Sequence, residues 1–151
     1  MMKHLGLAAM FKAIPLTLAL AVGSAPTNEL AAARIVGIKI TFHCTRDDKD
    51  DQDVVTMSLT RHDGHAVGEP LQDGAGNKWD NNTKIGPFFL AIAPQDSSQL
   101  DLKVSKSGTD GWIFHATGVG VLEGGGEVTL IDRSEEVNFR DGNQTKTWRL
   151  P

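Results

Sequence analysis

Alternation of apolar and polar residues along short segments is the feature that most constrains the fold of this chain. Residues 35–42, 54–59, 100–104 and 112–122 alternate in this way and are rich in Val, Ile, Thr and aromatic residues. Turn-forming Gly, Asp and Asn separate these segments, and no segment keeps a helical period. The pattern predicts one all-β domain over residues 34–151, folded as an antiparallel β-sandwich of about eight strands.

Weaker signals complete the expected set of strands. A short strand is expected near residues 66–71. Pro87 lies within the apolar segment 84–92, so that segment is expected to form an edge strand or to begin at Pro87. Residues 137–140 and 145–150 flank an Asp-Gly pair and are expected to form a hairpin.

The first 33 residues differ in character from the remainder of the chain. These residues contain the three parts of a secretory signal peptide: a basic start, an apolar run over residues 14–22, and small residues ending at Ala25 or Ala33. A membrane-spanning helix needs about 20 apolar residues, and this run is about half as long and contains Pro15. We therefore expect a signal peptide over residues 1–33, cleaved near Ala25 or Ala33. The product is expected to be secreted or periplasmic, without a transmembrane segment.

Charge and cysteine content narrow the possible partners. The net charge is −4 and no basic stripe is present, so we expect no nucleic-acid partner. Cys44 is the only cysteine, which excludes an internal disulfide. Its expected role is that of a small buried residue rather than a nucleophile.

Acidic and amide side chains concentrate in three loops. If each strand crosses the sandwich once, the loops over residues 45–53, 72–83 and 106–111 fall at the same end. Their Asp and Asn residues offer the oxygen ligands that calcium prefers, and clustered carboxylates would gain from a divalent cation. The alternative is that these residues only form solvated turns, in which Asp, Asn and Gly are favoured.

The order of several short motifs resembles the PLAT (lipoxygenase-homology) domain and its bacterial relatives. Residues 38–41 lead into the acidic loop and then into 53–59. The stretch 76–83 precedes the next strand, and residues 100–104 lead into 107–114. The resemblance covers roughly residues 35–122. It implies a β-sandwich without catalytic machinery that binds a lipid surface or a protein partner, in some members with calcium at the loop end.

The resemblance also implies a set of candidate site residues. It places Asp48, Asp53, Asp80 and Asp110 in a possible calcium site, to which we add Asp50 from the same acidic run. The candidate ligand-binding residues beside them are Trp79, Asn81 and Asn82. Trp side chains are usually buried, so a core position is the alternative for Trp79.

Catalytic motifs are missing from the sequence. No Gly-x-Ser-x-Gly elbow and no phosphate-binding loop is present. We therefore expect an exported, non-enzymatic binding module for a protein, lipid or glycan partner, with calcium as a possible cofactor. Two alternatives stay open: a small secreted hydrolase using Asp50 and Asp53, and a metal-independent protein-interaction or inhibitor domain.

Overall fold

A computed structural model describes residues 34–47, 49–133, 135–140, 142 and 144–151 of the chain. The signal peptide and the two cleavage positions expected within residues 1–33 lie outside this part. None of the described residues forms a helix long and apolar enough to cross a membrane.

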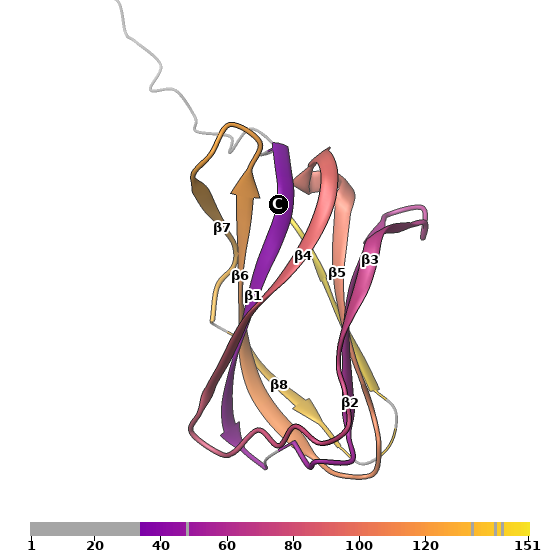
Figure 1. Cartoon of the computed structure of the whole chain (residues 1–151), viewed down its shortest axis with the longest axis vertical. Coiled ribbons are helices and arrows are strands. Elements are labelled where there is room, and N and C mark those ends of the chain that lie inside the picture. Colours follow the sequence, from indigo (N-terminus) through magenta and orange to yellow (C-terminus); the bar gives the residue numbers. More distant parts are fainter. Residues whose placement is uncertain (1–33, 48, 134, 141, 143) are drawn as a thin grey trace, which may run out of the picture.

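The described residues form nine strands in two antiparallel sheets that pack face to face (Figure 1). The strands are β1 (Arg34–Arg46), β2 (Val54–Arg61), β3 (Ala66–Asp73), β4 (Lys84–Asp96), β5 (Leu100–Ser107), β6 (Trp112–Leu122), β7 (Glu127–Ile131), β8 (Glu136–Phe139) and β9 (Gln144–Arg149). One sheet has the order β4-β1-β6-β7, with β8 also paired to β6, and the other has the order β3-β2-β5-β9. The expected β-sandwich is therefore confirmed.

The last two strands do not form the expected hairpin, so that prediction was wrong. β8 pairs with β6 in the first sheet, and β9 pairs with β5 in the second. Val137 and Phe139 of β8 are buried beside β6, where Phe139 contacts the ring of Trp112 at 5.9 Å between centroids. A local turn signal shows that the chain changes direction, but core contacts decide which sheet each strand joins.

The position of β4 agrees with its proline. β4 pairs with β1 along one side only, which makes it an edge strand of the first sheet. Proline has no backbone N–H to donate, and an edge tolerates this loss. β3 is the corresponding edge of the second sheet, and the two edge strands lie near each other.

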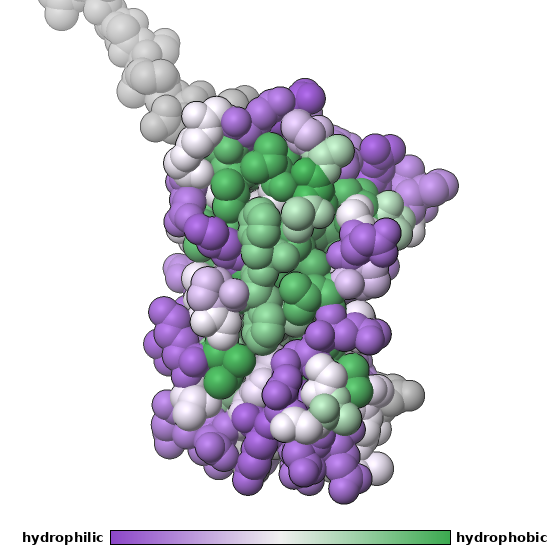
Figure 2. Space-filling view, in the orientation of Figure 1, coloured by the Kyte–Doolittle hydropathy of each residue, from purple (hydrophilic) through white to green (hydrophobic). Residues whose placement is uncertain are grey.

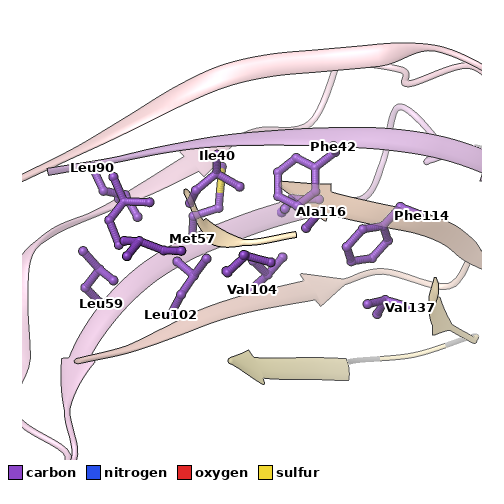
Figure 3. Close-up of a cluster of buried hydrophobic side chains, with 14 of the residues drawn as sticks. Ile40, Phe42, Met57, Leu59, Leu90, Leu102, Val104, Phe114, Ala116 and Val137 are labelled. Carbon is purple, nitrogen blue, oxygen red and sulfur yellow. The ribbon is translucent and has the colours of Figure 1, made fainter. Parts of the chain in front are cut away.

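Side chains from both sheets interdigitate in a continuous core (Figure 3). Alternate residues of β1 and β5 point inward, as the period of two requires. The ring of Phe42 lies at the centre of an aromatic group, with centroids 5.3 Å from both Trp79 and Trp112 and 5.4 Å from Phe114. Without a disulfide, this packing is what joins the two sheets.

Cys44 belongs to the same core, as expected. Only 2% of it is exposed, and the indole Nε1 of Trp112 donates a hydrogen bond to its Sγ at 3.3 Å. The thiol therefore accepts from an indole N–H that is fully buried.

Candidate functional site

The three acidic loops meet at one end of the sandwich, as the strand count predicted (Figure 1). The backbone N–H of Gly76 donates to the carbonyl of Asp51 at 2.5 Å, which joins the second loop to the first. Lys49 and Trp79 exchange two backbone hydrogen bonds of 3.2 and 3.1 Å. These contacts fix the loops against one another.

A buried lysine lies between the first two loops. The side chain of Lys49 is fully buried, and its ammonium donates to the carbonyl oxygens of Asn77 and of Asp50, the latter at 3.3 Å. The same Nζ lies 3.8 Å from a carboxylate oxygen of Asp73 and 5.4 Å from the ring centroid of Trp79. Burial lowers the pKa of Lys49, and nearby carboxylates, Asp73 first, oppose this effect.

A second buried lysine joins the first loop to the third. Lys106 and Asp53 are each 1% exposed, and the ammonium donates to Asp53 Oδ2 at 3.0 Å. Lys106 also donates to the backbone carbonyl of Asp110. Asp53 is therefore committed to an internal ion pair and does not face solvent.

Among the described residues, no other predicted metal ligand contributes its carboxylate to this ion pair. Asp50 and Asp80 are exposed, and Asp80 lies 3.7 Å from Lys78. Asp110 is partly buried, and its backbone oxygen rather than its carboxylate meets Lys106. Asp48 lies outside the described residues. The residues that the structure does describe contain no group of three His, Cys, Asp or Glu side chains arranged to hold a metal ion.

Of the three predicted ligand-binding residues, one is buried and two are exposed. Trp79 is 2% exposed and stacks on Phe42, so its ring belongs to the core. Asn81 and Asn82 are exposed at the surface of the second loop. Asn82 has a φ of +59°, a left-handed conformation that Asn adopts more readily than most residues.

The two buried lysines were missed from the sequence, although one had a signal. Lys106 follows Leu102 and Val104 at the spacing of two that points into the core. Its inward direction could have been predicted from that register. Lys49 lies in an irregular loop, where no periodicity indicates burial.

A second candidate site is an apolar groove between the edge strands β3 and β4. Residues 68–71 of β3 and 89–93 of β4 line it, and Glu69 is its only charged residue. Phe89 lies at its border and is 46% exposed, the one large hydrophobic side chain among the described residues that is exposed. Figure 2 shows a hydrophobic band along this side of the molecule with hydrophilic residues around it.

Phe89 owes its exposure to the strand register. Phe88 packs against the core, so the next residue of the strand must point outward. The ring of Phe89 lies over Gly37 of β1, where a Cβ atom would come within 2.5 Å of it. The adjacent pair Phe88-Phe89 was a usable sequence signal, because two neighbours in a strand cannot both face the core.

Comparisons of the chain with family models, curated proteins and solved structures find no match. The two candidate sites are therefore defined by this chain's own geometry: a loop end held by internal lysines, and an apolar groove between two edge strands.

Proposed function

We propose that the chain is an exported, non-enzymatic binding module of PLAT-like design that holds an apolar segment of a protein partner in the β3–β4 groove. The observation that carries the proposal is the exposure of Phe89 beside a groove with one charged residue. Exposed apolar surface rimmed by polar residues is typical of interaction sites.

The groove favours binding through side chains rather than addition of a strand. Pro70 of β3 and Pro94 of β4 lie in the two edge strands, and neither has a backbone N–H to offer to a partner strand. Apolar contact with Phe89, Leu71 and Ile92 supplies the affinity instead. The net charge of −4 favours a partner with basic residues beside its apolar segment over an anionic lipid surface.

Peptide display tests this proposal. We expect a random library to yield peptides in which Lys or Arg residues lie beside an apolar segment. We expect the variants Phe89→Ser and Ala91→Asp not to bind these peptides. Both positions are exposed, and neither side chain belongs to the hydrophobic core cluster. Thr147→Ala, at an exposed position of β9 in the other sheet, is the matched control and should bind as before.

Selected peptides that bind Phe89→Ser as tightly as the original chain would refute the groove as the binding site. Binding to neutral or anionic vesicles that Phe89→Ser abolishes, with no peptide selected, would instead identify a lipid ligand. Both readouts use the same three variants.

A second candidate function is calcium binding at the acidic loop end, and the convergence of the three loops favours it. Calcium at a hundred times its dissociation constant would stabilise the fold by about 2.7 kcal/mol. Thermal unfolding in millimolar calcium and in chelator measures this effect. An unchanged midpoint would remove the calcium candidate and leave binding in the groove unaffected.

A further inference from the structure

Two histidines face each other on the outer surface of the first sheet. His43 of β1 and His115 of β6 are register partners on adjacent antiparallel strands. Their neighbours Phe42 and Phe114 are fully buried, so both imidazoles point away from the core. Side chains directly opposite each other in such a pair have Cβ atoms about 5 Å apart.

A backbone carbonyl orients one of the two rings. His115 Nδ1 lies 3.0 Å from the carbonyl oxygen of Glu135. A carbonyl only accepts hydrogen bonds, so Nδ1 carries a proton, and the neutral form of the ring then has its free lone pair on Nε2. Histidines that bind metal ions commonly have this arrangement, in which the second nitrogen donates to a carbonyl or carboxylate.

Two cationic side chains lie near His43. Lys84 of β4 is its register partner on the side away from His115, and the charge of Arg133 also acts on the ring. The same cations repel a metal ion, so they limit the affinity of the pair.

One acidic side chain continues the row of histidines. Glu136 of β8 is the register partner of His115 on the side away from His43. Its carboxylate lies 3.2 Å from Arg46 and is partly exposed. The row therefore has two imidazoles and one carboxylate on three neighbouring strands.

We propose that His43 and His115 form a two-imidazole site for a divalent transition metal ion of the copper, nickel and zinc group. These ions bind imidazole nitrogen at about 2.0–2.1 Å, so two ligands of one ion lie about 3 Å apart, within reach of opposed histidines. Water or a donor from a partner completes the coordination. Hard ions such as calcium prefer oxygen ligands, so we do not expect this pair to bind them.

Titration of the untagged full chain with Cu²⁺, Ni²⁺ and Ca²⁺ tests the site. All variants carry His4→Asn, because a histidine near the amino terminus binds copper independently. We expect one Cu²⁺ ion per chain, a weaker Ni²⁺ site and no Ca²⁺ at this position. His43→Asn and His115→Asn should each weaken Cu²⁺ binding at least tenfold. The electron paramagnetic resonance spectrum of Cu²⁺ bound to the protein with both histidines should show coupling to two nitrogens.

His65→Asn is the matched control, because His65 is an exposed histidine in a turn away from the pair. It should leave Cu²⁺ affinity unchanged. The loss of affinity in the double variant His43→Asn/His115→Asn should be smaller than the sum of the two single losses, since both residues are ligands of the same ion. Copper affinity in the double variant that equals that of the original chain, or losses that are fully additive, would overturn the proposal.

Discussion

The buried ion pair between Lys106 and Asp53 gives the sharpest test of how the loop end is held. Replacing Lys106 with Met keeps an unbranched apolar side chain one atom shorter and leaves the Asp53 carboxylate buried without its cation. Both groups are 1% exposed and 3.0 Å apart. Removing one member of a buried pair costs about 3–5 kcal/mol, because the remaining charge has lost both water and its partner.

The size of this effect can be converted into a melting shift. A domain of about 120 residues unfolds with an entropy near 0.25 kcal/mol/K, so each kcal/mol lowers the midpoint by about 4 °C. We therefore expect Lys106→Met to lower the midpoint by about 12–20 °C. Urea unfolding at neutral pH measures the free energy directly.

The matched control is an ion pair at the surface. Lys39 and Glu127 lie 2.5 Å apart with side chains 43% and 50% exposed. Lys39→Met should cost less than about 1 kcal/mol, since water screens this pair. The double variant Asp53→Asn/Lys106→Met should lose less free energy of unfolding than the two single variants lose in sum, because it leaves no unpaired charge. Fully additive losses, or a loss below 1 kcal/mol for Lys106→Met, would refute the reasoning.

Three further predictions follow from other described residues. Phe42→Ala should cost about 3–5 kcal/mol in urea unfolding, since the ring lies at the centre of the aromatic group. Gly108→Ala should destabilise by about 2 kcal/mol or more, because φ is +129° and a Cβ atom would overlap the Asp53 carboxylate; Gly124→Ala, with nothing within 4 Å, should change stability by less than about 0.5 kcal/mol. The free energy of unfolding of the original chain, minus that of Lys49→Met, should increase as the pH rises toward 10.5. Burial lowers the pKa of Lys49 in the folded chain, so at these pH values the unfolded chain binds more protons than the folded chain. A difference that does not change with pH would contradict this.

Much of the fold could be predicted from the sequence because strand periodicity is local. Alternation identified β1, β5 and β6 as strands. Pro87 predicted either an edge strand or a strand that begins at Pro87, and the edge position is the correct one, since β4 begins at Lys84. Strand parity placed the three acidic loops at one end. These conclusions need only the two-residue repeat and the rule that consecutive strands reverse direction.

The sequence by itself therefore determined the fold class, the buried position of Cys44 and the convergence of the acidic loops. Only the tertiary structure decided that Asp53 faces Lys106 rather than solvent, that Trp79 belongs to the core and that β8 and β9 join different sheets. The physical reason is that charge pairing and sheet choice depend on residues far apart in the sequence, such as Asp53 and Lys106 with a sequence separation of 53. Local patterns contain no information about such partners, whereas the register of packed strands fixes them.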